Sequence, residues 1–199
     1  TVTDWFRSSK KAYELNSVTK DNKGNAISDP TIYVLREAVN WVKENQTEFG
    51  IDISDYDQDK DGYIDCVQLV YSCPQKYGDY VANNSFLYGA FTYWDTANKA
   101  NPSSPVANVY TWISSDFLLD GYSASKRNGG KLYCDKNNKP LPDAHTFIHE
   151  TGHCFGLDDY YSYDPIVKSN PLGKLDMMDV NIGDHNPYSK YLLGWVNPI

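Results

Sequence analysis

Two histidines and an aspartate in the last third of the chain stand at a spacing that can bind a metal ion. The sequence HETGH occupies residues 149–153, and Asp159 follows ten residues after the first histidine. Residues four apart on a helix lie on one face, so the imidazoles of His149 and His153 can bind a single ion. Two imidazoles and one carboxylate leave the fourth position of a zinc ion open to water, which is typical of catalytic zinc sites.

The residues next to the histidines have types that fit hydrolysis. Glu150 lies beside the metal-binding face, where it can hold a metal-activated water and act as the general base. Gly156 can adopt a positive φ, so we expect it to end the helix and turn the chain back toward the metal. Asp159 then stands where sites of the HExxHxxGxxH type have their third histidine, and the adjacent Asp158 is the alternative third ligand.

A second acidic group has the spacing of a calcium-binding loop. Aspartates at positions 57, 59, 61 and 65 match positions 1, 3, 5 and 9 of such a loop, and a glycine stands at its sixth position. The twelfth position has Gln68 in an apparent strand, so the loop is not an EF-hand, and a solvated acidic turn is the alternative. The predicted calcium ligands are Asp57, Asp59, Asp61, Asp65 and the carbonyl of Tyr63.

The hydrophobic pattern predicts the elements that position these residues. Apolar residues recur at helical spacing between residues 31 and 45, after an Asp-Pro pair, which predicts an amphipathic helix. Residues 63–72 are apolar almost throughout, as in a buried strand. Further β-rich runs are expected at residues 86–94 and 108–114, the metal-binding helix at about 143–155, and a short helix at 187–193.

Composition indicates a globular protein without a membrane span. The chain has 199 residues, of which 41% are hydrophobic, so we expect one domain over residues 1–199. No run approaches the roughly 20 apolar residues of a transmembrane helix. A net charge of -8 argues against nucleic acid as a partner, and we expect a monomer. Because the chain begins at Thr1 without a signal peptide, we expect it to be excised from a longer secreted protein.

Taken together, these motifs resemble the secreted bacterial metallopeptidases of the immune inhibitor A type. The resemblance is carried by the metal motif with its continuation to residue 161, the acidic run at residues 55–65, the sequence DMMD at residues 176–179, and the Ser-Lys and Leu-Gly-Trp segments at 189–190 and 193–195. It implies an α+β zincin fold of the metzincin-like kind, with a twisted mixed β-sheet, an active-site helix and a small C-terminal subdomain carrying a Met-turn. It also implies zinc and calcium as cofactors and extracellular proteins as substrates.

The resemblance also assigns a residue to the floor of the metal site. By analogy with a Met-turn, Met178 is expected to pack its thioether beneath the zinc ligands, with the adjacent Met177 as the alternative. The chain departs from the family at two positions, where the family usually has proline instead of Asp158 and an acidic residue instead of Ser162. The first departure is what makes Asp158 a rival ligand.

A donor for the developing oxyanion is expected after the Met-turn. Tyr188 and His185 are the candidates, since both lie within ten residues of Met178 and both can donate a hydrogen bond. Simple packing of either side chain is the alternative, and Asn181 is expected to shape the turn. A backbone N–H of the strand at residues 108–114 is a further possibility.

Four cysteines suit an exported protein and allow three pairings. A bond between Cys66 and Cys73 is excluded if one extended strand joins them, because its ends would lie far beyond the roughly 7 Å that a disulfide allows. Cys73 with Cys134 is the predicted disulfide. Cys154 is expected to be a small buried residue of the helix, and its pairing with His153 as a nucleophile is the weaker reading.

The sequence therefore predicts a secreted zinc metalloendopeptidase, a hydrolase that cleaves peptide bonds of extracellular proteins by means of a metal-activated water. The predicted site comprises His149, His153 and Asp159 for zinc, with Glu150, His185 and Tyr188 for catalysis. One alternative is a catalytically inactive or adhesive calcium- and zinc-binding domain of zincin fold. A cysteine peptidase that needs no metal is the other.

Overall fold

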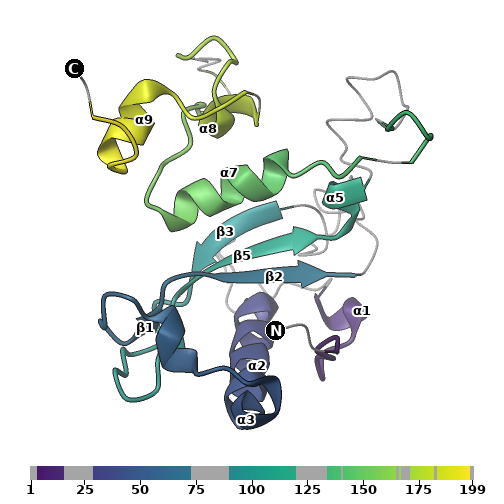
Figure 1. The fold of residues 1–199 in the computed structure, drawn as a ribbon, viewed down its shortest axis with the longest axis vertical. Coiled ribbons are helices and arrows are strands. Elements are labelled where there is room, and N and C mark those ends of the chain that lie inside the picture. Colours follow the sequence, from purple (N-terminus) through teal and green to yellow (C-terminus); the bar gives the residue numbers. More distant parts are fainter. Residues whose placement is uncertain are drawn as a thin grey trace. The chain divides into compact units, whose positions relative to one another are not determined.

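The protein forms two compact units in a computed structural model. The first unit spans Thr1–Ser115 and the second Asp116–Ile199 (Figure 1). The structure describes residues 4–15, 29–72, 90–119, 134–139, 141–164, 166, 171–181 and 183–197. Helices and a mixed sheet occur together, so the α+β class expected from the sequence is confirmed.

The longest helix in the described part of the first unit is α2, from Pro30 to Glu44. It begins at a proline, and the Asp29 side chain caps it by accepting a hydrogen bond from the Thr31 N–H at 2.8 Å. Its apolar face buries Val34, Leu35 and Val39, so the predicted amphipathic helix is confirmed. Among the described residues of this unit, short helical segments also occur at α1 (Ala12–Leu15), α3 (Gln46–Phe49) and the 3-10 turn η1 (Ile53–Tyr56).

A three-stranded mixed sheet forms the other layer of the first unit. Its order is β2 (Val67–Tyr71), β5 (Val109–Ser114) and β3 (Ala90–Trp94). The central strand β5 runs parallel to β2 and antiparallel to β3, so that Trp112 stands opposite both Leu69 and Phe91. The strands β3 and β5 confirm the described parts of the two predicted β-rich runs, while residues 86–89 lie outside the described part of the chain.

The strand predicted at residues 63–72 is interrupted. It forms β1 (Tyr63–Ile64), which pairs with β4 (Val106–Ala107), and then β2 in the other sheet. Asp65 is one of the two residues between these strands, and its backbone N–H donates to the Tyr56 carbonyl of η1 at 2.8 Å instead of to a strand. The prediction of one continuous strand was therefore wrong, because apolar composition does not reveal a change of bonding partner.

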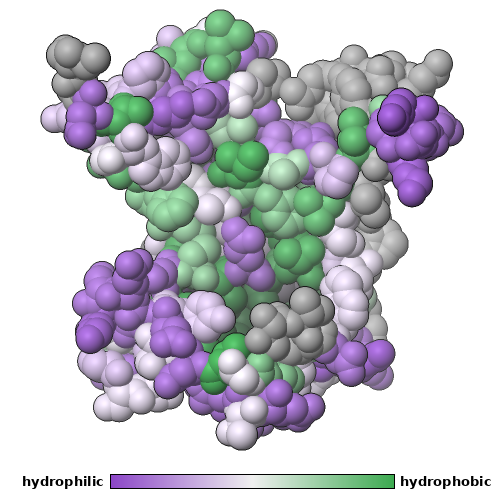
Figure 2. Space-filling view, viewed as in Figure 1, coloured by the Kyte–Doolittle hydropathy of each residue, from purple (hydrophilic) through white to green (hydrophobic). Residues whose placement is uncertain are grey.

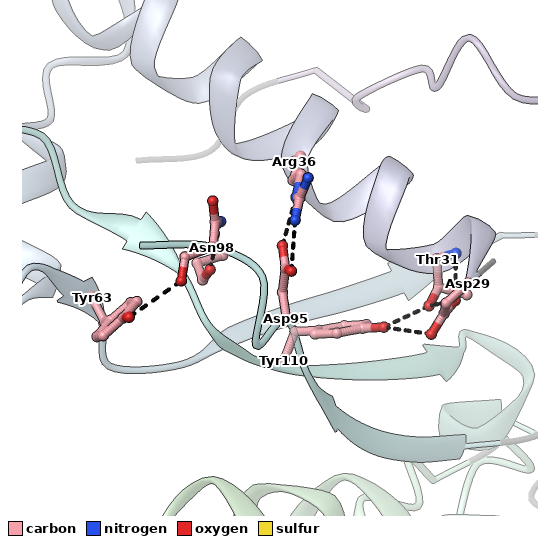
Figure 3. A network of polar contacts seen from close by, with 8 residues as sticks. Asp29, Thr31, Arg36, Tyr63, Asp95, Asn98 and Tyr110 are labelled. Atoms are coloured by element: carbon pink, nitrogen blue, oxygen red, sulfur yellow. Dashed lines mark hydrogen bonds and ion pairs between the residues drawn. The ribbon is translucent and has the colours of Figure 1, made fainter. Parts of the chain in front are cut away.

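Polar contacts tie α2 to the loop and strand beside it (Figure 3). Arg36 donates two hydrogen bonds, of 2.6 and 2.7 Å, to the carboxylate of the fully buried Asp95. The Thr31 hydroxyl lies 2.6 Å from the hydroxyl of Tyr110, which also reaches the Asp29 carboxylate. The side chains of Thr31, Tyr110 and Asp95 are thus hydrogen-bonded at the edge of the core that Leu35, Tyr110 and Trp112 share.

The second unit contains α5 (Asp116–Leu119), α7 (His145–Cys154), α8 (Met177–Val180) and α9 (Pro187–Leu192). Helices α7 and α9 confirm the two helices predicted for this region. Helix α9 is capped by Asn186, whose side chain accepts from the Ser189 N–H at 3.0 Å. None of the helices in the described part of the chain is long and apolar enough to span a bilayer.

Candidate metal centre

Helix α7 presents the histidine pair on one face. The ring centroids of His149 and His153 lie 4.9 Å apart, and the ring planes are almost perpendicular. His149 is buried and His153 is half-buried. The i, i+4 spacing in the sequence therefore becomes two adjacent imidazoles, as expected for residues one turn apart.

The end of α7 reverses the chain just after the second histidine. The Leu157 N–H donates to the Gly152 carbonyl at 3.1 Å, and the Gly156 N–H donates to the His153 carbonyl at 2.9 Å. These two bonds form a Schellman motif, which needs a left-handed residue at the position of Gly156. Gly156 has a φ of 88°, so the predicted positive φ is confirmed.

The reversed chain brings Asp159 to the histidines. Its Oδ1 lies 3.0 Å from Nε2 of His149 and 3.5 Å from Nε2 of His153. One donor atom from each of the three residues lies within 4.8 Å of the others, so the three form a group that could hold a metal ion. Asp158 is exposed and does not belong to that group, although its neighbour does.

Backbone carbonyls orient both imidazoles. Nδ1 of His149 lies 2.7 Å from the carbonyl of Met177, and Nδ1 of His153 lies 2.7 Å from that of Leu157. A carbonyl oxygen can only accept, so each Nδ1 carries a proton and donates it. In the neutral rings both Nε2 atoms therefore keep a lone pair directed toward Asp159, and this is the tautomer that a metal ligand requires.

The surroundings of Asp159 fit a cation between these donors. Its Oδ1 is buried, yet among the described residues it accepts no hydrogen bond of acceptable geometry, even though both Nε2 atoms are near. A buried carboxylate oxygen without a hydrogen bond is costly unless an ion satisfies it. Two imidazole nitrogens and one carboxylate oxygen are also the donor types that zinc prefers. On both counts the three residues fit a zinc ion.

The electrostatics of the group favour the ionised carboxylate. Burial alone would raise the pKa of Asp159, but His149, His153 and the hydroxyl of Tyr163 lower it below the ordinary value. Burial alone would likewise lower the pKa values of the two histidines, and the nearby Asp159 carboxylate and the backbone carbonyls raise them instead. In the absence of metal, the group thus behaves as a carboxylate between two basic imidazoles.

Two tyrosines that follow the ligand contact it. The Tyr163 hydroxyl donates to Oδ2 of Asp159, and Tyr161 interacts with the same carboxylate. Burial and Asp159 raise the pKa of Tyr163 to about 12, so its hydroxyl is a donor throughout the neutral range. Neither tyrosine was among the predicted site residues. The available signal was the run of tyrosines at positions 160, 161 and 163, directly after a candidate ligand.

Glu150 lies in α7 next to His149 and is buried. Consecutive residues of a helix are separated by about 100°, so Glu150 borders the histidine face without pointing along it. Its negative charge contributes to the raised pKa values of both histidines and of Tyr163. The carboxylate is therefore electrostatically coupled to the residues around the candidate metal site.

Met178 lies against the middle of the histidine helix. It is fully buried, and its Sδ atom would be 2.7 Å from a Cβ placed on Gly152, one residue before His153. The glycine thus makes room for the thioether directly beside the ligand pair. Met177, the alternative floor residue, instead offers its backbone carbonyl to His149.

The short helix α8 fixes these methionines. Asp176 caps it by accepting from the Met178 N–H at 2.7 Å, and its second carboxylate oxygen accepts two hydrogen bonds from Asn186. Tyr160 donates its backbone N–H to the Met178 carbonyl at 2.9 Å, which links the ligand loop to α8. Asn181 ends the helix with a left-handed φ of 55°, so the prediction that it shapes the turn is confirmed.

The two predicted oxyanion donors lie in different surroundings. His185 is buried, its Cε1 would be 3.2 Å from a Cβ on Gly152, and its ring contacts Trp195 at 5.7 Å. Its Nδ1 has no hydrogen-bond partner among the described residues. Tyr188 is 65% exposed on α9. His185 therefore lies beside the helix that carries the ligands, while Tyr188 makes no hydrogen bond or ring contact with those ligands among the described residues.

The acidic loop of the first unit gathers three of its four aspartates. Carboxylate oxygens of Asp57, Asp59 and Asp61 lie within 4.8 Å of one another, and hydrophilic side chains cover this region beside β1 (Figure 2). Asp57 is buried and accepts hydrogen bonds from the N–H groups of Asp61 and Gly62. Asp65 is not part of that group, and its carboxylate accepts a 3.4 Å hydrogen bond from the Gln58 N–H.

The predicted disulfide falls outside the described residues, because Cys73 is not among them. Cys154 is the last residue of α7 and is half-buried, as is Cys66 between β1 and β2.

Comparison with known proteins identified no relative of this chain. No protein-family model, curated protein or solved structure matches it.

Proposed function

We propose that this protein is a zinc-dependent endopeptidase that hydrolyses peptide bonds of extracellular proteins. The observation that carries the proposal is the convergence of His149, His153 and Asp159 on one point, with both Nε2 lone pairs turned inward and a buried carboxylate oxygen that lacks a hydrogen bond. Catalytic zinc sites use three protein ligands of these types, and they leave one position for water or substrate.

The roles of the residues follow from where they lie. His149, His153 and Asp159 would hold the ion, and the carbonyls of Met177 and Leu157 keep the imidazoles in the ligating tautomer. When bound, zinc would act as a Lewis acid and lower the pKa of a water molecule at the open position. Glu150 would accept the proton from the attacking water and deliver it to the leaving amine.

The finer features of the fold belong to the same proposal. We include in it a zincin fold of the metzincin-like kind, resembling immune inhibitor A-type enzymes; the mixed sheet described in the first unit and the histidine helix described in the second are elements of the kind such a fold contains. The contact between Met178 and Gly152 supports a Met-turn beneath the ligands. A single secreted, monomeric catalytic domain, with a structural calcium ion at Asp57, Asp59 and Asp61, completes the proposal.

The decisive experiment measures zinc content and peptide hydrolysis on the same preparations. The wild-type chain should bind one zinc per molecule and cleave an unfolded protein substrate. Glu150→Gln should keep its zinc and its fold but lose activity by several orders of magnitude, because the general base is removed. Glu48→Gln is the matched control, since Glu48 is an exposed glutamate of α3 in the other unit.

Two outcomes would favour other functions. Zinc binding without hydrolysis of any peptide would point to the inactive or adhesive zinc- and calcium-binding domain. Activity that survives phenanthroline but is lost in iodoacetamide would point to a cysteine peptidase. Appreciable turnover by zinc-loaded Glu150→Gln would remove Glu150 from the proposed role.

A further inference from the structure

The two oxygens of the Asp159 carboxylate have different neighbours. Oδ1 faces the imidazoles of His149 and His153 and accepts no hydrogen bond among the described residues. Oδ2 accepts a hydrogen bond from the Tyr163 hydroxyl. The side chain of Asp159 is only 5% exposed, so water cannot freely replace that donor. The carboxylate is therefore held by one oxygen while the other is directed toward the candidate metal position.

Tyr163 reaches this buried carboxylate from an exposed position. The residue is 78% exposed, and its ring contacts that of Tyr161 at 5.3 Å between centroids. Tyr161 interacts with the same carboxylate and is half-buried. An exposed ring contributes little to the packing of a core. The main structural contribution of Tyr163 is therefore the hydrogen bond from its hydroxyl to the Asp159 carboxylate.

We propose that Tyr163, supported by Tyr161, is a positioning residue that restricts Asp159 to binding zinc through Oδ1 alone. This inference rests on the zinc site of the proposed function. Carboxylate ligands can bind a metal through one or both oxygens, and hydrogen bonds from neighbouring groups decide which oxygen is available. Without the Tyr163 hydroxyl, Oδ2 would be free to turn toward the ion and occupy the position that water or substrate needs.

Three measurements on Tyr163→Phe separate this role from a structural one. The substitution removes a single hydrogen bond, so the metal-free protein should still fold, with a melting temperature only slightly below that of the wild type. Zinc affinity, measured by competition with a chelator, should fall about 10- to 100-fold, as is usual when a partner of a ligand is lost. Cobalt(II) in place of zinc should absorb more weakly in the visible range, because its coordination number rises when Oδ2 binds.

Tyr191→Phe is the matched control. Tyr191 is a tyrosine of α9 that is 52% exposed, and the described residues give its hydroxyl no role at the site. Its zinc affinity, cobalt spectrum and melting temperature should all equal those of the wild type. The comparison therefore removes any general effect of deleting a phenol oxygen from the surface.

The outcomes distinguish this inference from the function on which it rests. If Tyr163→Phe keeps both the zinc affinity and the cobalt spectrum of an active wild type, the inference is overturned and the peptidase stands. Unchanged zinc binding with reduced hydrolysis would make Tyr163 a substrate contact and would also overturn it. If the wild type binds no zinc, or if Asp159→Ala binds it as tightly, both the inference and the proposed function fail.

Discussion

The Sδ atom of Met178 occupies the space that a side chain at Gly152 would fill. The glycine lies between the two candidate ligands of α7, and a Cβ added to it would come within 2.7 Å of the sulfur. Met178 is fully buried, so it cannot withdraw into solvent. The position of the methionine and the placement of the histidines are thus mutually dependent.

Gly152→Ala should therefore disturb the site. The extra methyl group must displace Met178 or shift α7, and overpacking of this kind costs about 1–3 kcal/mol. We expect a lower melting temperature and weaker zinc binding, measured by thermal unfolding and chelator competition. A double mutant with Met178→Ala should recover part of the loss, because the space is then available. Additive losses in that cycle would show that the two residues do not compete for space.

The third ligand can be identified by a pair of alanine substitutions. Asp159→Ala should remove most of the zinc, because a two-histidine site lacks the carboxylate that completes it. Asp158→Ala should keep zinc near the wild-type level, since Asp158 is exposed and outside the group. Metal content after dialysis measures both variants. The reverse pattern would assign the ligand role to Asp158.

Burial of His185 predicts a dependence of stability on pH. Burial lowers its pKa from the ordinary value of 6.5, so the unfolded chain takes up the proton before the folded protein does. Stability should then fall as the pH decreases below about 6.5, until the folded-state pKa is passed. Melting temperatures of metal-free wild type and His185→Gln between pH 7.5 and 5 should converge toward the acid end. A constant difference between the two proteins would exclude this contribution.

Calcium should stabilise the first unit through the acidic loop. A ligand that binds only the folded state at 100 times its dissociation constant adds about 2.7 kcal/mol. The melting temperature at fixed zinc should therefore rise with calcium, and Asp57→Asn should abolish the rise. Asp65→Asn should keep most of it, because Asp65 lies outside the group of three carboxylates. A melting curve indifferent to calcium would leave the loop as a solvated turn.

Arg36→Ala should destabilise the first unit. The substitution leaves the fully buried Asp95 without the two hydrogen bonds that Arg36 donates. Breaking a buried ion pair costs about 3–5 kcal/mol, and the lower end is expected here because the Arg36 side chain is 44% exposed. Denaturant unfolding measures the loss. Arg7→Ala, at an exposed arginine of the same unit, is the control and should be nearly neutral.

The features that the sequence predicted best are local ones. Helical spacing and an Asp-Pro start were enough to predict α2, and the motif itself predicted α7 and the positive φ of Gly156. The interruption at Asp65 was missed, because it depends on a hydrogen bond to the Tyr56 carbonyl rather than on the type of residue. Composition and periodicity do not encode such a pairing.

The same distinction applies to the candidate site. Spacing in the sequence was sufficient to group His149, His153 and Asp159, because one helix and one turn connect them. The carbonyl groups that accept from the imidazoles belong to Met177 and Leu157. Every residue has a backbone carbonyl, so the type of residue does not reveal which carbonyl will accept such a hydrogen bond. Tyr161 and Tyr163 could be seen in the sequence as residues that follow Asp159. The direction of their side chains, however, depends on the conformation of the backbone after Asp159, which the sequence does not reveal.

The backbone of the acidic loop is shaped by another part of the chain. The Gly62 carbonyl accepts hydrogen bonds from the N–H groups of Asn101 and Val106, and a Cβ on Gly62 would lie 2.6 Å from the Asn101 nitrogen. Together with its φ of 89°, this close approach permits only glycine. A cation entering the loop would thus meet carboxylates whose backbone is already fixed by residues some 40 positions away. Little conformational entropy remains to be lost on binding, so affinity for the ion should report how completely the first unit has folded.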